Sequence, residues 1–225
     1  MGTSAASVYT GPGSPTLNLK TASPSNPASM FSTYTLCTIV GRGGGLGAGG
    51  NNNNQDDVSY LFGTASGNGT FTCRVRYIAG TSSDGGYAGA GLMVRTSLAN
   101  DARNVAVMLT DGNGVTFQWR SQDNGPEEAW PMSIAIGVGA PIWVRLNKHY
   151  DTFTVSYSQD GVKWYNPTSV AVAFGPSPYY VGIVATTHDP TRIVVDLVDR
   201  IDGFTPHMYA SIQPTPQASS SSSAG

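Results

Sequence analysis

The sequence predicts an all-β protein: an antiparallel β-sandwich with extended arms at both ends. Short segments alternate between apolar and polar residues with a period of two, as expected where successive side chains of a strand point to opposite faces. Clusters of Gly, Asn and Asp separate these segments and supply hairpin turns. No segment shows the 3.6-residue period of an amphipathic helix. With 225 residues and 40% hydrophobic content, the chain is long enough for one sizeable core.

The alternation is clearest in FTCRVRY, residues 71–77, and it recurs in four further segments. Each predicted strand should therefore have one face toward the core and one toward water. The residues predicted to face the core are Phe71, Cys73, Val75, Tyr77, Leu92, Val94, Val115, Phe117, Trp119, Ile142, Val144, Leu146, Phe153, Val155 and Tyr157. The residues predicted to face water are Thr72, Arg74, Arg76, Met93, Arg95, Gln118, Arg120, Trp143 and Arg145.

The two ends of the chain differ from the rest in composition. Residues 1–28 are predicted as an N-terminal arm, residues 29–206 as the sandwich, and residues 207–225 as a Pro- and Ser-rich tail. Neither end shows the alternation that would bury a face, so both are expected to add little to the stability of the sandwich.

Charge, hydropathy and cysteine content narrow the possible partners and the possible location of the protein. Only 12% of the residues are charged, the net charge is −2, and no basic block would follow a phosphate backbone, so nucleic acid is not an expected partner. No apolar run reaches the length of a membrane span, and the first residues lack a signal-peptide pattern. Cys37 and Cys73 form either one disulfide or two buried thiols, because their spacing does not fix the geometry.

The order of these segments resembles a known superfamily. The succession GNGTFTCRVRYI, AGAGLMVRTSLANDARNVAVMLTDGNGVTFQWR, APIWVRLNKHYDTFTVSYSQDGVKW and YYVGIVATTH is similar to the concanavalin A-like lectin/glucanase superfamily, and most to its laminin-G-like, DUF1349-type modules. The resemblance covers about residues 36–204 and lies in strand order and hairpin positions. The resemblance implies a concanavalin A-like jelly-roll sandwich of two antiparallel sheets. Members of the superfamily often bind carbohydrate, sometimes with calcium, while others are structural or adhesive.

Glucanases of that superfamily carry two glutamates and an aspartate in an ExDxxE pattern on one strand face, because hydrolysis needs two carboxyl groups beside the glycosidic bond. This chain has two glutamates, Glu127 and Glu128, whose side chains would point to opposite faces of a strand. They lie in QDNGPEEAW, which is predicted as a loop. The chain is therefore not expected to be an enzyme.

Other motifs have ordinary structural interpretations. Gly45, Gly47 and Gly50 match GxGxxG, but NNNNQDD follows instead of a helix, so a flexible loop is expected. The segment SQDGVKW resembles the Asp-box hairpin of sialidases and predicts a tight hairpin with Trp164 over the core. The residues spaced by three, Asp196, Asp199 and Asp202, are expected at solvated edge positions.

Two loops could hold a cation. NNNNQDD and TSSDGG offer several oxygen atoms, and calcium binds sets of carboxylate, carbonyl and amide oxygens. Asp56, Asp57 and Asp84 are therefore candidate calcium ligands, and plain turns are the alternative. No other cofactor is expected.

The sequence favours two functions and does not choose between them. The first is a lectin-like module at a cell or particle surface, in which aromatic rings stack on sugars and polar groups donate hydrogen bonds. Its candidate residues are Tyr87, Arg95, Arg120, Trp130, Trp143 and Tyr179. The alternative is a subunit of an extracellular assembly or virion, a homo-oligomer that uses its arms for assembly. In that case one shared face would meet a neighbouring subunit. That face would comprise Arg74, Arg76, Arg95, Arg120, Trp143 and Arg145.

Overall fold

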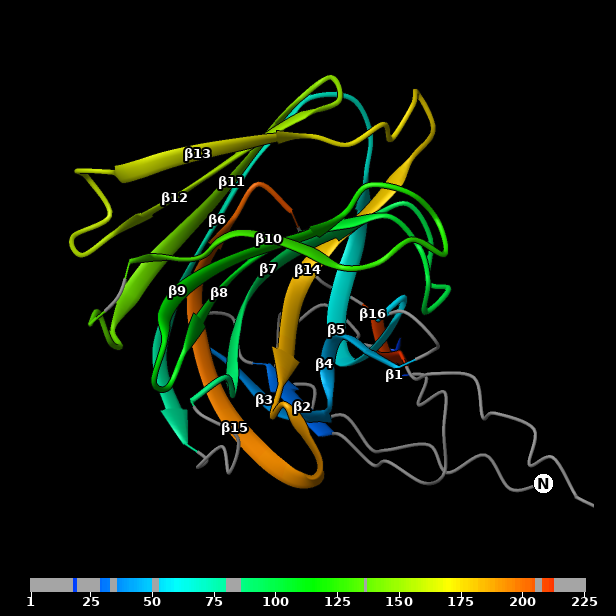
Figure 1. Ribbon diagram of the computed structural model, residues 1–225. Coiled ribbons are helices and arrows are strands. Elements are labelled where there is room, and N and C mark those ends of the chain that lie inside the picture. The colour runs from blue at the N-terminus through cyan, green and yellow to red at the C-terminus, as the bar shows by residue number, and fades with distance from the viewer. Residues whose placement is uncertain are drawn as a thin grey trace, which may run out of the picture.

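The computed structural model describes residues 18–19, 29–32, 36–49, 53–79, 86–135, 137–204 and 208–212. This part of the chain contains no helix, and its strands form two curled sheets that pack face to face (Figure 1). It thus has no helix that could span a membrane. All paired strands run antiparallel except one short terminal pair. The predicted jelly-roll β-sandwich is confirmed.

Nine strands form the larger sheet. In spatial order they are β1 (Asn18–Leu19), β16 (Met208–Ile212), β5 (Gln55–Ala65), β14 (Tyr179–Thr186), β7 (Gly89–Arg95), β8 (Asn104–Thr110), β9 (Gly114–Arg120) and β10 (Glu128–Ala135), with β4 (Gly45–Gly49) beside β5. The Gly-rich segment predicted as a flexible loop thus forms β4.

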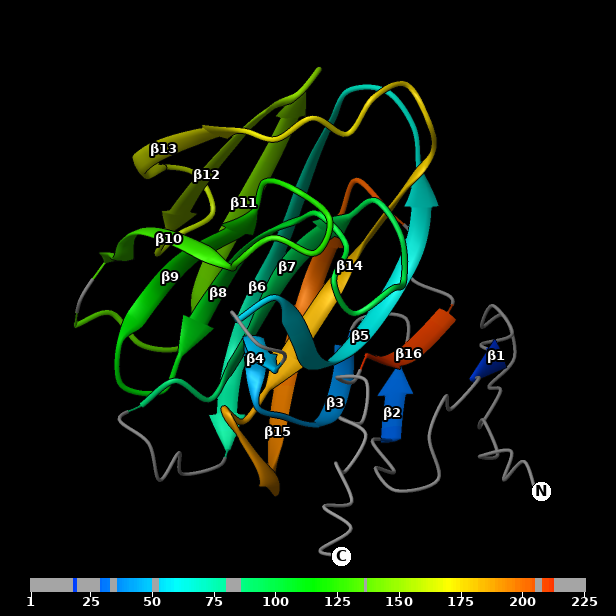
Figure 2. The same cartoon turned by 45° about the vertical axis from the view of Figure 1, so that its right-hand side comes forward.

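Seven strands form the second sheet. In spatial order they are β13 (Tyr165–Ala171), β12 (Thr152–Ser158), β11 (Ile142–His149), β6 (Gly69–Ala79), β15 (Asp189–Asp202), β3 (Leu36–Gly43) and β2 (Ser29–Ser32). Strands distant in sequence pair at the centre of both sheets, β5 with β14 and β6 with β15, which places residues from the two halves of the chain side by side (Figure 2).

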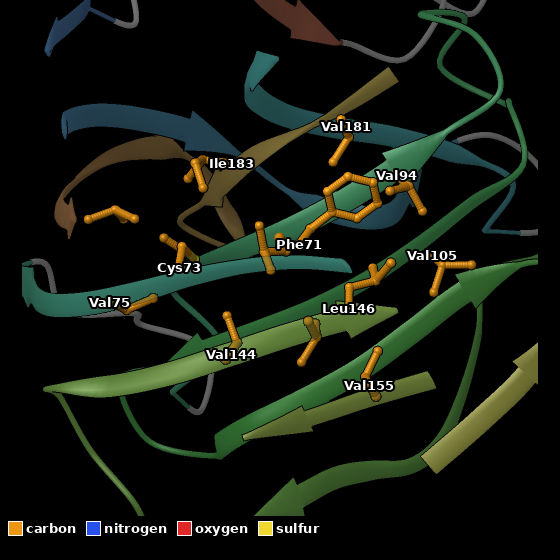
Figure 3. Close-up of a cluster of buried hydrophobic side chains, with 14 of the residues drawn as sticks. Phe71, Cys73, Val75, Val94, Val105, Val144, Leu146, Val155, Val181 and Ile183 are labelled. Carbon is orange, nitrogen blue, oxygen red and sulfur yellow. The ribbon is translucent and has the colours of Figure 1, made fainter. Parts of the chain in front are cut away.

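The main core fills the space between the two sheets. Figure 3 shows Phe71 and Cys73 of β6 in this layer together with Val94 of β7 and Val181 of β14. The ring of Phe71 meets that of Tyr179 edge to face, with centroids 6.3 Å apart. Each fully buried side chain of this size stabilises the fold by about 1.5–3 kcal/mol. Of the predicted core residues, all but Tyr77 belong to this cluster or pack against it.

Tyr77 is 53% exposed, because a β-bulge interrupts the alternation of β6. Along β15, Leu197 pairs with Tyr77 and the next residue, Val198, pairs with Val75, so Arg76 is an extra residue in β6. An extra residue reverses which side chains face inward. Ile78 packs against the core in place of Tyr77.

A second apolar cluster covers the outer face of the nine-stranded sheet. Tyr60 and Phe62 of β5 stack there with ring centroids 5.2 Å apart, and the Tyr60 hydroxyl donates to the Met93 carbonyl at 2.9 Å. The cluster consists of Leu46, Val58, Tyr60, Phe62, Met93, Ala106, Met108, Val184 and Ile212. The prediction that Met93 faces water is therefore wrong: β7 and β8 are buried at every position, because apolar groups cover both faces of the sheet.

The aspartates of β15 also differ from the expectation of solvated positions. Asp196 points into the interior, and neither of its carboxyl oxygens has a hydrogen-bond partner among the described residues. Burial, and secondarily the charge of Asp111, raises the pKa of Asp196 well above its ordinary value. Asp199 is buried in an ion pair, and only Asp202 is exposed as expected.

Both terminal segments contribute strands. Residues 208–212, within the predicted tail, form β16, which pairs with β5, and Ile212 is buried in the second cluster. Asn18–Leu19, within the predicted arm, pairs in parallel with β16. Cys37 and Cys73 are free, buried thiols, and burial raises the pKa of Cys37 to about 12.

Candidate functional site

A buried cluster of charges joins the ends of three strands in the nine-stranded sheet. Arg120 of β9 binds Asp56 of β5 with two nitrogens, Nη2 to Oδ1 at 2.6 Å and Nη1 to Oδ2 at 3.1 Å. Arg95 of β7 donates to the same Oδ2 at 3.0 Å. All three side chains are completely excluded from solvent. One carboxylate thus bridges two guanidinium groups, and both of its oxygens accept charge-assisted hydrogen bonds.

Glu127 and Asn104 extend this cluster. Glu127 Oε2 lies 3.2 Å from Arg120 Nη2, and Asn104 Nδ2 donates to the same oxygen at 3.3 Å. The other oxygens, Glu127 Oε1 and Asn104 Oδ1, have no hydrogen-bond partner within the described ranges. Burial, and next the negative charge of Asp56, raises the pKa of Glu127 to about 8. Glu127 precedes β10, and its backbone N–H donates to the Asn53 carbonyl at 2.9 Å.

The arginines of this cluster also hold the loops beside them. Arg95 Nε donates to the Ser97 carbonyl at 2.7 Å, and Arg120 donates to the carbonyls of Ala102 at 3.1 Å and Gly125 at 2.9 Å. The prediction that Arg95 and Arg120 face water is therefore wrong, and these two candidate ligand-binding residues lie in the interior. Their donors are engaged inside the protein, and neither side chain reaches the surface.

The outer face of the seven-stranded sheet carries a different arrangement, which is partly exposed. Arg74 of β6 forms a two-nitrogen ion pair with Asp199 of β15, at 2.7 and 2.6 Å. The same guanidinium lies 5.5 Å from the ring centroid of Trp143, which is paired with Arg74 across β11 and β6. A Cβ at Gly161 would lie 2.8 Å from the Trp143 ring, so the hairpin backbone packs closely against the indole.

Arg145 lies two residues along β11 from Trp143 and faces the same side. Its guanidinium stacks on the ring of Trp164, with Cζ 3.4 Å from the centroid. Trp164 follows the hairpin of SQDGVKW, in which Asp160 Oδ1 accepts the backbone N–H groups of Val162 and Lys163, both at 2.8 Å. The tight hairpin is present as predicted, but Trp164 lies on Arg145 on the outer face and not over the core. We call Arg74, Trp143, Arg145 and Trp164 the Trp–Arg face.

The predicted shared face is thus divided between the two sheets. Arg74, Arg76, Trp143 and Arg145 belong to the seven-stranded sheet, whereas Arg95 and Arg120 belong to the nine-stranded one. The pattern of alternation indicates which side chains share a face within a strand, and it contains no information on which sheet a strand joins.

The remaining candidate ligand-binding residues are scattered. Tyr179 is buried, its ring lies 5.1 Å from Lys148 Nζ and its hydroxyl donates to the Gly67 carbonyl. Tyr87 is partly buried, and its ring centroid lies 5.1 Å from that of His188. The side chain of Trp130 lies outside the described residues. Of the candidates, the structure places Trp143 on the Trp–Arg face.

The two candidate calcium ligands that the structure describes, Asp56 and Asp57, bind groups of the protein itself. Both oxygens of Asp56 are bound by arginines, and Asp57 Oδ2 accepts the Gly44 N–H at 2.8 Å. Asp84 lies outside the described residues. Within the described part of the chain, no group of three or more His, Cys, Asp or Glu side chains could hold a metal ion.

Comparison with known proteins supports the fold. No protein-family model and no curated protein matches the sequence. A functionally unknown protein from Saccharomyces cerevisiae is 18% identical with a TM-score of 0.56, over 80% of this chain and 94% of that one. The GH43 protein BlXynB from Bacillus licheniformis is 13% identical (TM-score 0.49; 75% of this chain, 33% of that one). The exoplasmic/lumenal domain of VIP36, bound to calcium and Man3GlcNAc, is 10% identical (TM-score 0.40; 84% of this chain, 85% of that one).

The fold is therefore an antiparallel β-sandwich of two curled sheets, and the yeast protein of unknown function shares it. These likenesses concern the fold alone, because all identities are low. The finer resemblance to laminin-G-like, DUF1349-type modules stays a prediction.

The expectation that the chain is not an enzyme requires correction. Solved structures that resemble it include a xylan β-1,4-xylosidase from Bacillus halodurans and an alginate lyase from Klebsiella pneumoniae. This chain spans about a third of the length of the GH43 proteins. The lack of an ExDxxE pattern argues only against the catalytic arrangement of the glucanases. It does not exclude other kinds of enzyme activity.

Proposed function

We propose that this protein binds carbohydrate through the Trp–Arg face of the seven-stranded sheet. The observation that carries the proposal is the pairing of Trp143 with Arg74 and of Trp164 with Arg145 on one partly exposed sheet face. Indole rings offer flat apolar surfaces for the C–H faces of sugars, and guanidinium groups donate directed hydrogen bonds to sugar oxygens.

The geometry of this face favours binding because its side chains are held in place before a ligand arrives. Asp199 orients Arg74, the Gly161 backbone packs on Trp143, and the Asp160 turn positions Trp164. Groups that are already ordered lose less conformational entropy when a ligand binds. The sheet also supplies a rigid support, since Trp143 and Arg145 belong to a strand that is paired on both sides.

The alternative role, as a subunit of an assembly, depended on the arms. Their described parts, β1 and β16, pair with the sheet of the same chain. Within the described residues, no observation favours assembly over binding. We extend the proposal to action outside the cell or at a particle surface, where carbohydrate polymers are exposed to proteins.

Affinity electrophoresis tests the proposal. The protein would be run in native gels that contain soluble polysaccharides, both neutral and anionic. We expect slower migration in at least one gel, and loss of this retardation in Trp143→Ala and Trp164→Ala. Tyr150→Ala is the matched control, because Tyr150 is an aromatic residue that is 72% exposed in the turn after β11. Equal retardation of all three variants and the parent would contradict the proposed face.

A further inference from the structure

We propose that the carbohydrate bound by the Trp–Arg face is anionic, and that Arg145 binds its uronate carboxylate or sulfate ester. The inference rests on the proposed function and specifies the class of ligand.

Ion pairing distinguishes Arg145 from most arginines of this protein. The guanidinium groups that lie within 4 Å of a carboxylate are those of Arg74, Arg76, Arg95, Arg103, Arg120 and Arg192. Arg145 has no such partner among the described residues, and its buried Nε has no hydrogen-bond acceptor there. Arg42 shares the missing Nε acceptor, but no described aromatic ring lies under its guanidinium. Arg145 thus combines an uncompensated charge with an aromatic support.

The surroundings of Arg145 make an anionic partner favourable. Partial burial disfavours the charged form and lowers the pKa of its guanidinium, and no nearby carboxylate offsets this effect. An anion supplied by a ligand would provide the missing Coulomb attraction and a hydrogen-bond acceptor. The Trp164 ring supports the guanidinium, with Cζ 3.4 Å from the centroid, and the planar fork of an arginine binds a carboxylate or sulfate with two parallel hydrogen bonds.

Arg74, the other arginine of the Trp–Arg face, differs from Arg145 in its ion pairing. Arg74 donates to both oxygens of Asp199, so its charge is already compensated. Arg76 also lies 3.8 Å from Asp199 Oδ2. The anionic group should therefore bind at the Arg145 end of the face, with a neighbouring sugar toward Trp143.

The test compares anionic polymers with their neutral counterparts. Apparent Kd values would be measured by titration calorimetry at 150 mM salt, which screens unspecific attraction to a polyanion. The probes are polygalacturonate, its carboxyl-reduced form, dextran sulfate and dextran. The carboxylate pair and the sulfate pair distinguish the two sources of negative charge.

Three variants separate a specific contact from a general charge effect. Arg145→Met keeps the stacking on Trp164 and removes the charge, Arg145→Lys keeps the charge without the planar fork, and Arg103→Met makes the same charge change beside the other sheet. Arg103 pairs with Asp123 at the surface, so its loss should perturb the fold little. Thermal unfolding of each variant shows whether it is folded.

We expect the parent protein to bind at least one anionic polymer tenfold or more tightly than the neutral form, the order of magnitude of one charge-assisted contact. Arg145→Met should abolish this difference, Arg145→Lys should reduce it, and Arg103→Met should retain it. Equal binding of neutral and anionic polymers, or unchanged preference in Arg145→Met, would overturn the inference and leave the proposed function standing. Binding of none of the four polymers would overturn the inference, whereas retardation by another polysaccharide in the affinity gels would still support the proposed function.

Discussion

Arg120 donates two hydrogen bonds to the carboxylate of Asp56, from Nη2 at 2.6 Å and from Nη1 at 3.1 Å. Both side chains are completely buried. Asp56 lies on β5 and Arg120 on β9, with β14, β7 and β8 between them in the sheet. The pair therefore holds together parts of the sheet that no backbone hydrogen bond joins directly. Arg95 on β7 completes the bridge.

Asp56→Asn should destabilise the protein by about 3–5 kcal/mol, because it leaves the buried Arg95 without a counter-charge and Arg120 with Glu127 alone. Unfolding in guanidinium chloride, followed by intrinsic fluorescence, would measure the loss. Asp123→Asn is the control, since the exposed pair of Asp123 with Arg103 should contribute about 1 kcal/mol or less. Similar losses in both variants would contradict the importance of the buried cluster.

Glu127 should make stability depend on pH. In the unfolded chain its carboxyl loses its proton near pH 4.3, and in the folded protein only near pH 8, so the folded state binds the extra proton between these values. The free energy of unfolding should therefore fall as pH rises from about 4 to 8, by at most about 1.4 kcal/mol per pH unit for this group. Glu127→Gln should lack this component. Parallel stability curves for the two proteins would show that the pKa of Glu127 is not raised.

Asp196→Asn should stabilise the protein at neutral pH, because the variant removes the cost of keeping an acid with a raised pKa in the interior. We expect a gain in stability at pH 7 that shrinks as pH falls and is lost below about pH 4, where the carboxyl of Asp196 becomes protonated in the unfolded chain as well. Asp202→Asn, an exposed change on the same strand, is the control and should have no measurable effect. A loss of stability at pH 7 in Asp196→Asn would mean that the ionised carboxylate has a partner.

A chain that ends at residue 204 should be less stable than one that ends at residue 212. The shorter chain lacks β16, which pairs with β5 and buries Ile212 in the second apolar cluster. Loss of that burial alone should cost about 1.5–3 kcal/mol, and the exposed edge of β5 should promote aggregation. Thermal unfolding and light scattering of both chains would measure these effects. Identical melting curves would support the sequence-based expectation that residues after 206 add little to stability.

Most of the sandwich could be predicted from local alternation, because the faces of a strand follow from its own residues. Phe71, Cys73 and Val75 face the core as predicted. The bulge at Arg76 could not be predicted, since it depends on pairing with β15, more than a hundred residues later in the chain.

The candidate sites depended even more on contacts distant in sequence. Asp56 lies 39 residues from Arg95 and 64 from Arg120, so no local pattern could show that these arginines are buried. Trp143 and Arg145 could be placed on an outer face from alternation alone. The stacking of Trp164 on Arg145 could not, because it depends on the path of the hairpin capped by Asp160.

The most direct test of carbohydrate binding at the Trp–Arg face is an NMR titration that follows the indole N–H signals, assigned by single tryptophan replacements. The titrant would be a soluble oligosaccharide of a polymer that retards the protein in affinity gels. Binding should shift the signals of Trp143 and Trp164 on the outer face and leave that of Trp119, which packs against the core, unchanged. Shifts confined to Trp119 or Trp130, with Trp143 and Trp164 unaffected, would contradict the proposed site.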